Sequence, residues 1–406
     1  MAAQWTAPGD IFSVLLIVGA DVIQLACAAM TGGPGLLPTP VAFSFGWVAY
    51  AISAMLSALG ERRLLKCPPE VEVKVINLAS GYARTNHSWL LGRFVKTYPF
   101  WMPTSVRAKI KPSPSLPPTT QGTGDLRADR VALCVAVYQW KSSPRPSQPS
   151  RDWLWWSGYA TSAVQLAVSM IPLVLYRDWT IIMATAAGTA LSYASASLPQ
   201  WRREKWHGRR GSSKPVALTS GNGSVHVIIV EGADETCDLE ALAGGPWAQD
   251  STYTVFSTSL LAVLWLALLI SCTGIAANTW YLLGIGGMGM LQNIVAAAAP
   301  RMPDALGLPV QLVMRGEGLG HDGETLGVVF AEPKVMWALM ELEMWRKGYG
   351  RYLREEFFPG ALRQWEQKWW DSVDVNERTR LLDDARTQWH NEQQRLAREA
   401  KNGKSS

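Results

Sequence analysis

Six long apolar stretches constrain this chain more than any other feature of its sequence. Each is roughly as long as the 20 or so residues that an α-helix needs to cross the hydrocarbon core of a bilayer. None of the stretches contains a lysine or an arginine. They cover residues 11–30, 41–59, 153–176, 179–198, 254–274 and 279–299. We therefore predict a polytopic α-helical membrane protein with six transmembrane helices.

Short links join the predicted helices into three hairpins. The links cover residues 31–40, 177–178 and 275–278, and Arg177 is the only one of the 38 lysines and arginines that falls in them. All the other basic residues lie in the segments on the opposite side of the membrane. Because cytosolic flanks are enriched in lysine and arginine, we predict that both termini and both long loops are cytosolic.

The predicted cytosolic segments change from long apolar runs to short alternating ones, which are typical of half-buried strands. Strands are predicted over residues 71–75, 131–140, 225–230, 309–314 and 326–330, and a short helix over residues 88–98. Since the strands come from three separate segments, we predict one mixed sheet in a composite cytosolic α+β domain. The tail from residue 333 to about residue 400 is predicted to be helical, with breaks near residues 348–350 and 359–360.

This organisation divides the chain into six parts. They are a first transmembrane hairpin (1–59), a cytosolic α+β loop with Pro/Ser linkers (60–152), a second transmembrane hairpin (153–198), a cytosolic loop with a strand (199–253), a third transmembrane hairpin (254–299), and cytosolic strands with a Trp-rich helical tail (300–406).

Polar side chains inside the apolar stretches are the candidate functional residues. A carboxylate at the centre of a bilayer costs about 2.5–3.5 kcal/mol, and no basic residue within a span could pair with Asp21. We predict an intramembrane polar cavity, with Asp21 as a candidate catalytic proton donor to a lipophilic substrate. The other residues that we expect to line it are Gln24, Gln165, Tyr193 and Asn293. The alternative is purely structural: hydrogen bonds between helices, with Asp21 bonded to Gln24 or Asn293.

Metal, cofactor and nucleic-acid sites have little support in the sequence. The five cysteines form no CxxC pair, and the five histidines are scattered without an HExxH motif. Residues 284–289 spell GxGxxG but lie within a predicted span, where glycines allow helices to pack closely. We therefore expect no metal, no cofactor and no nucleic-acid partner. The basic run over residues 201–210 suits anionic lipid headgroups better.

One stretch of the chain resembles a known family. Residues 43–51 (FSFGWVAYA), 73–82 (VKVINLASGY) and 86–92 (NHSWLLG) are similar to a largely uncharacterised family of filamentous-fungal multi-pass integral membrane proteins. The resemblance covers residues 34–95 well and the rest of the chain mainly by its layout. Some members lie in secondary-metabolite gene clusters. The resemblance therefore implies a role with a lipophilic natural product and an endomembrane location, such as the endoplasmic reticulum, but it implies no catalytic residue.

Three functions follow from these observations. The first is assistance to fungal secondary-metabolite biosynthesis, by cyclising or isomerising a lipophilic intermediate in the intramembrane cavity. The second is a non-catalytic membrane scaffold, which would bind other biosynthetic enzymes through its strands and its Trp-rich tail. The third is an exporter. We expect this one least, because the sequence shows no internal repeat and no interrupted helix. Whether the chain is an enzyme stays open, and the expected partners are the bilayer, a lipophilic small molecule and partner enzymes.

Overall fold

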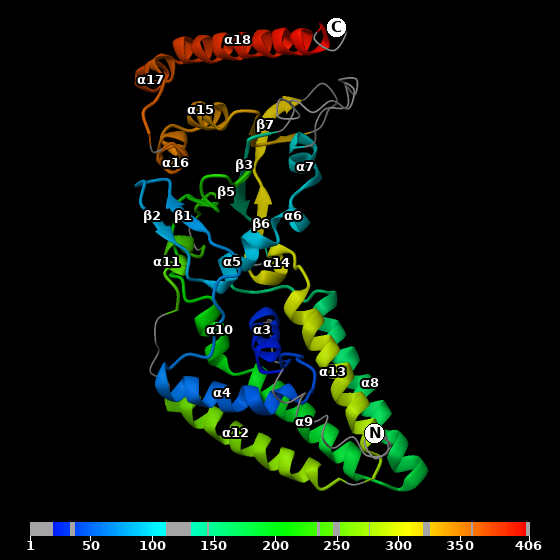
Figure 1. Cartoon of the computed structure of the whole chain (residues 1–406). Helices are drawn as coiled ribbons and strands as arrows, with labels where there is room; N and C mark the ends of the chain where they lie inside the picture. The colour runs from blue at the N-terminus through cyan, green and yellow to red at the C-terminus, as the bar shows by residue number, and fades with distance from the viewer. Residues whose placement is uncertain are drawn as a thin grey trace.

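The computed structural model describes residues 19–32, 37–110, 131–143, 146–233, 236–246, 252–275, 277–319, 325–358 and 360–402. It stacks three layers along one axis (Figure 1). A bundle of apolar helices lies at one end, a mixed β-sheet lies in the middle, and the helices of the C-terminal tail cover the sheet at the other end.

Among the described residues, four helices are long and apolar enough to cross a membrane. They are α8 (Trp153–Tyr176), α9 (Thr180–Ala196), α12 (Thr252–Thr273) and α13 (Thr279–Ala298); the span that contains α9 continues through the short helix α10 (Pro199–Lys205). They form two hairpins whose links meet at the end of the bundle far from the sheet, where Asn278 Nδ2 donates a hydrogen bond to Asp178 Oδ2 at 3.0 Å. The predicted class of helical membrane protein is confirmed at this level.

Exposed aromatic side chains mark both ends of these four helices. At the end near the sheet they are Trp153, Trp156, Tyr253 and Phe256, and at the far end they are Tyr176, Trp179 and Trp280. Aliphatic side chains are exposed between the two groups, including those of Val164, Val174, Val263, Ile270 and Leu291. Aromatic side chains collect at the two interfaces of a bilayer, so this distribution agrees with helices that span one.

The other two predicted spans contain shorter helices. These are α3 (Ala20–Met30), with 11 residues, and α4 (Gly46–Gly60), with 15. Both are shorter than the roughly 20 residues that a crossing needs, and residues 11–18 lie outside the described part of the chain. Six spans in three hairpins are therefore not confirmed.

Residues 37–45, which we call the re-entrant segment, enter the bundle without helical structure. The segment begins at the sheet end of the bundle, where the Thr39 amide donates to Ser197 Oγ at 2.8 Å. It reaches the middle, where the Phe43 ring lies so close to Gly188 of α9 that a Cβ there would be 2.4 Å away. Helix α4 then returns to the sheet end, where the Leu64 amide donates to the Glu204 carboxylate at 2.9 Å. Residues 37–60 thus enter and leave the bundle at the same end.

Helices α3 and α4 begin side by side at the depth that the re-entrant segment reaches. A Cβ on Gly46 would lie 2.6 Å from the Cα of Gly19, and a Cβ on Gly19 would lie 2.7 Å from the end of the Met290 side chain in the middle of α13. Larger residues at these two positions would push the helices apart. From this contact, both helices run towards the sheet.

The sheet is the composite one that the sequence predicts. Its strand order is β2 (Ala83–Thr85), β1 (Lys74–Asn77), β4 (Val216–Thr219), β5 (His226–Val230) and β3 (Leu133–Trp140), and β6 (Val310–Leu312) and β9 (Val329–Glu332) both pair with β3. Only the β3–β5 pair is parallel. Strands β7 (Met314–Leu319) and β8 (Thr325–Gly327) form a separate pair.

The two faces of the sheet belong to two cores, and successive residues of β3 alternate between them as strand geometry requires. Cys134, Ala136 and Tyr138 join the core on the bundle side, whereas Val135 and Val137 join the core beneath the tail. The bundle side carries α5 (Trp89–Lys96), α6 (Tyr98–Trp101), α7 (Thr104–Ile110), α11 (Leu239–Ala243) and α14 (Pro303–Leu306). The other side carries α15 (Val335–Trp345), α16 (Tyr349–Phe357), α17 (Gln364–Asp371) and α18 (Val375–Asn402).

Candidate functional site: the re-entrant segment and the layer beneath it

Two of the predicted cavity residues bind the backbone of the re-entrant segment. Gln165 Nε2 donates to the carbonyl oxygens of Phe43 and Ile285, each at 2.8 Å. Asn293 Nδ2 donates to the carbonyl of Ala42 at 3.0 Å. Both side chains are buried, with 0% and 1% exposure. Backbone that is not helical cannot satisfy its own carbonyls, and lipid offers no partner, so these two amides make the irregular path possible.

Gln165 and Asn293, with two aromatic side chains that we did not predict, form what we call the polar clamp on the re-entrant segment. Tyr159 donates from its hydroxyl to the carbonyl of Pro38 at 2.6 Å, and Trp47 Nε1 donates to the carbonyl of Ala42 at 2.9 Å. The predicted residue Tyr193 acts one step away, because its ring packs edge-on against Tyr159 with the centroids 5.6 Å apart. Pro38 and Pro40 disfavour a helix. They are the signal in the sequence from which the non-helical start of this segment could have been predicted.

Glycines of α13 bring the clamp into close contact with the segment. A Cβ on Gly289 would lie 1.7 Å from the Phe43 carbonyl oxygen, and a Cβ on Gly286 would lie 2.0 Å from the Phe45 ring. These are glycines of the GxGxxG run, and their role in close packing is as predicted. Because these glycines have no side chain, the re-entrant segment lies close enough to α13 for Asn293 to reach its backbone.

The clamp leaves acceptor capacity unused inside the bundle. Among the residues that the structure describes, Gln165 Oε1 and Asn293 Oδ1 have no hydrogen-bond partner, although both atoms are buried. An unsatisfied buried acceptor costs about 1–3 kcal/mol. These two amide oxygens are therefore acceptors in the bundle interior whose hydrogen bonds the described residues do not supply.

Asp21 and Gln24 lie apart from the clamp. Asp21 is in the first turn of α3 and its side chain is exposed on the surface of the bundle, while Gln24 is half-buried. No other residue in the described ranges forms a hydrogen bond or an ion pair with either side chain. The bond from Asp21 to Gln24 or Asn293 that the structural alternative requires is therefore not formed. A carboxylate in the first turn of a helix is favoured by the helix dipole.

A layer of buried charge lies between the bundle and the sheet. Arg301 forms two hydrogen bonds with the Asp152 carboxylate, at 2.7 and 2.8 Å, and a third with the carbonyl of Ala29. Arg93 binds Glu70 at 2.8 Å and also donates to two carbonyls at the end of α13. The last carbonyls of a helix lack partners within that helix. These arginines therefore supply partners to the ends of α3 and α13 and fasten the sheet domain to the bundle.

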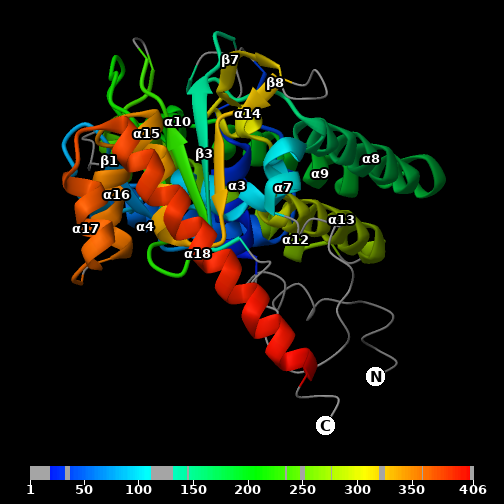
Figure 2. The same cartoon turned by 90° about the horizontal axis from the view of Figure 1, so that it is seen from above.

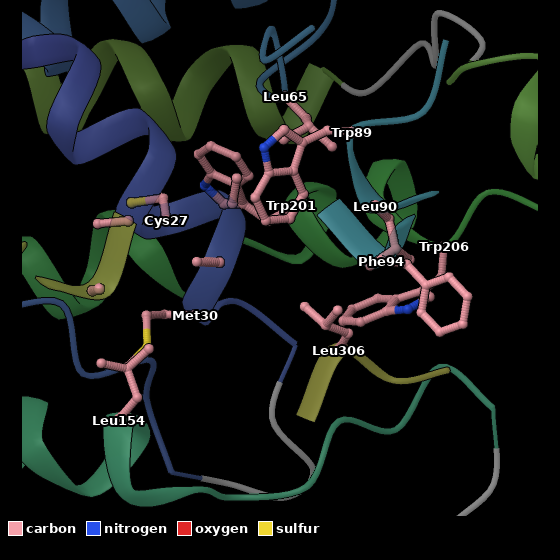
Figure 3. Packing of buried hydrophobic residues seen from close by; sticks show 14 of the residues in the cluster. Cys27, Met30, Leu65, Trp89, Leu90, Phe94, Leu154, Trp201, Trp206 and Leu306 are labelled. Carbon is pink, nitrogen blue, oxygen red and sulfur yellow. The ribbon is translucent and has the colours of Figure 1, made fainter. Parts of the chain in front are cut away.

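Lys205 is the most deeply buried basic side chain of this layer, at 1% exposure. Its Nζ donates to the carbonyls of Ala29 and Thr31, both at 3.2 Å, and lies 4.8 Å from the centre of the Trp206 ring. Figure 3 shows Trp206 with Trp89 and other apolar side chains of the surrounding core. The sequence showed a basic run here, but nothing in it indicated that one of its cations points inward.

A small cavity lies on the bundle side of the sheet. Its volume is about 130 Å³, and its polar lining includes Lys96, Tyr98, Ser220, Ser224 and His226. The hydroxyls of Tyr98 and Tyr138 are 3.1 Å apart, and burial lowers the pKa of His226 so that its imidazole is neutral near neutral pH. These groups can hydrogen-bond a small polar molecule. Within the described ranges, no three or more His, Cys, Asp or Glu side chains are grouped so that they could hold a metal ion.

Comparison of the chain with models of protein families, with curated proteins and with solved structures found no match. The resemblance to fungal membrane proteins therefore stays a prediction, and the functional argument depends on the geometry described above.

Proposed function

We propose that this chain is a membrane-anchored scaffold, which holds a cytosolic domain at the bilayer and presents its C-terminal tail to partner proteins. The four long helices supply the anchor. The layer of Arg93, Lys205 and Arg301 supports a fixed mounting of the sheet domain, because each of these side chains donates hydrogen bonds to backbone carbonyls at a helix end. A scaffold needs such a mounting to keep its binding surface at a set distance from the membrane.

Helix α18 is the single observation that carries this proposal. Its first half is docked, because Arg386 binds both Glu332 and Glu341 and because Leu382 is buried. From His390 to Leu396 every side chain is exposed except the half-buried Gln393. Figure 2 shows this half of the helix projecting beyond the body of the molecule. A helix of 28 residues is about 42 Å long, so its free half is available to another protein.

The test is a truncation that removes the free half and keeps the docked half. A chain that ends at His390 retains Arg386 and Leu382, so it should still fold and reach the membrane. Partner enzymes of the pathway should co-purify with the full chain and be lost from the truncated one. If they co-purify equally well with both, α18 is not the recruiting element and the proposal fails.

The setting that we propose is the one implied by the fungal resemblance: the endoplasmic reticulum, in the biosynthesis of a lipophilic secondary metabolite. Metabolites of a native strain and of a strain without the gene should be compared, with intracellular and exported pools separated. Build-up of an unprocessed precursor supports the biosynthetic role. A finished product trapped inside the cells supports export instead. The structural argument for export would be that α3 and α4 begin side by side deep in the bundle, since helices that begin within the membrane form the substrate site of many transporters.

Asp21 supports a second candidate function, which is proton donation to a lipophilic intermediate during cyclisation or isomerisation. The supporting observation is that its carboxyl group is exposed on the bundle and has no partner among the described residues. Asp21→Asn keeps the shape of the side chain and removes the acid. Unchanged product yield at an equal protein level would end this candidate and leave the scaffold.

The orientation that we propose places both termini and the sheet in the cytosol. Positive charge in the sequence supports this side, because nearly all lysines and arginines lie in the segments that form the sheet domain and tail. The six-span topology would place residues 31–40 on the opposite side. We favour a topology of four spans with a re-entrant hairpin over residues 37–60, since both ends of that hairpin bond to the sheet end of the bundle.

A further inference from the structure

Arginines from two separate segments meet at the sheet end of the bundle. Arg62 and Arg63 lie two and three residues after the end of helix α4, and Arg202 and Arg203 lie on α10. Arg63 is half-buried, and the other three are exposed. Each segment lies where an apolar helix of the bundle ends, which is the level of the membrane surface for a helix that reaches or crosses the bilayer.

A buried hydrogen-bond network fixes the two segments side by side. The Glu204 carboxylate accepts from the amides of Leu64 and Leu65 at 2.9 and 2.6 Å. In addition, Gln200 Nε2 donates to the carbonyl of Arg62 at 3.0 Å. Glu204 is only 2% exposed, so its carboxylate binds groups inside the protein and does not face the solvent. Arg202 and Arg203, which precede Glu204 on α10, are exposed beside this buried network.

Two of these arginines have no acidic partner among the residues that the structure describes. Arg202 and Arg203 form no salt bridge there, whereas the charge of Arg63 acts on the nearby Glu204 carboxylate. Cations nearby are paired: Lys66 lies 3.1 Å from Glu61, and Arg301 lies 2.7 Å from Asp152. The uncompensated charge is therefore concentrated on Arg202 and Arg203, with Arg63 beside them.

An apolar surface adjoins the arginines on the membrane side. Leu56 and Leu59 of α4 are 60% and 55% exposed, and they come within two turns before Arg62 and Arg63. Helix α12 packs along α4 and exposes Tyr253 and Phe256 near its start. The surface thus combines a cationic level at the membrane boundary with an apolar wall below it.

We propose that Arg63, Arg202 and Arg203 bind the headgroup of an anionic phospholipid in the leaflet next to the sheet domain, with its acyl chains against Leu56 and Leu59. Guanidinium groups bind phosphate oxygens in a bidentate manner, and clustered basic residues at a membrane boundary attract anionic lipids. The apolar wall selects a lipid over a soluble phosphate, because only a lipid covers both surfaces.

The test uses the full chain in nanodiscs of phosphatidylcholine, with or without a quarter of it replaced by phosphatidylserine. Phosphatidylserine retained after extraction into a mild detergent is counted by mass spectrometry. Arg202→Gln with Arg203→Gln should lower retention by about tenfold, and Arg63→Gln should lower it in the same direction. Arg395→Gln with Arg398→Gln, which removes equal charge from exposed positions on α18, should leave retention unchanged.

Three results of the retention measurement would overturn the proposal. They are equal retention in the R202Q/R203Q variant, an equal loss in the R395Q/R398Q control, and retention in the native chain that does not fall at high salt. Inorganic phosphate added to phosphatidylcholine nanodiscs separates the two sources of the headgroup chemistry. If it raises the melting temperature as much as phosphatidylserine does, the site binds free phosphate and the lipid proposal is wrong. If R202Q/R203Q does not fold, Arg63→Gln decides alone.

Discussion

The side-chain amide of Gln165 lies 2.8 Å from the carbonyl oxygen of Phe43, in the interior of the helical bundle. This bond joins a long helix to a stretch of backbone that has no helical hydrogen bonds of its own. The same nitrogen also bonds to the carbonyl of Ile285, so one buried side chain links α8, α13 and the re-entrant segment. Gln165 is therefore the residue on which the path of residues 37–45 depends most.

Gln165→Leu should destabilise the bundle, because it leaves the Phe43 carbonyl buried without a partner. The expected loss is about 1–3 kcal/mol, seen as a lower melting temperature in detergent. Gln24→Leu is the matched control, since Gln24 is half-buried and makes no hydrogen bond to any described residue. Equal melting temperatures for the native chain and the Gln165 variant would show that the bond does not support the segment.

Arg301→Gln should cost about 3–5 kcal/mol, because it leaves the Asp152 carboxylate next to the bundle without its cation. Arg301 is 3% exposed, and its side chain forms two of its hydrogen bonds with Asp152. Adding Asp152→Asn to the same chain should recover part of the loss, which a double-mutant cycle of melting temperatures measures. Lys141→Gln breaks the more exposed pair with Asp304 and should change stability by less than about 1 kcal/mol. A similar loss in both single variants would contradict the role of the charge layer.

The stability of the folded chain should decrease as pH rises towards 7, because of Glu332. Burial, and secondly the charge of Glu341, raise the pKa of Glu332 to about 7, whereas an unfolded glutamate has a pKa of about 4.3. Between these two values the folded chain holds a proton that the unfolded chain has lost. Its stability therefore falls as pH increases through this range and is greatest below it.

Glu332→Gln should remove this part of the pH dependence, because the amide is neutral at every pH. Melting temperatures across pH 4 to 8 measure it, as the difference between native and variant chains. Glu355→Gln serves as the control, because Glu355 is exposed and makes no bond with any described residue. The assignment is wrong if the E332Q difference is independent of pH.

Apolar length predicted the four long helices correctly, because a crossing helix must be apolar over its whole length. The same criterion could not distinguish residues 41–59 from a fifth crossing, since a helix buried among other helices is equally apolar. What distinguishes them is the bonding of the preceding backbone to Gln165 and Asn293, which are far away in the sequence. The sequence analysis identified Gln165 and Asn293 as buried polar residues, but it could not identify the backbone carbonyls that they bind.

Alternation predicted β3 and β5, because both strands are long enough to show a period of two. It missed β2 and β4, which have three and four residues, and it began β1 three residues early, at residue 71 where the structure begins at Lys74. The inward direction of Lys205 was also invisible, because its carbonyl partners at the end of α3 belong to a distant segment. Long-range contacts decide these features, and no local pattern encodes them.

The most direct test of this account is the side of the membrane on which residue 37 lies. Leu37→Cys, in a variant whose five native cysteines are replaced by serine, can be labelled with a membrane-impermeant maleimide in sealed microsomes; Leu37 is 47% exposed. The account predicts labelling from the same side as Asn391→Cys in the tail, and from the side opposite to Arg177→Cys in the far link. Labelling of residue 37 together with residue 177 would contradict the re-entrant path and restore the hairpin of two full spans.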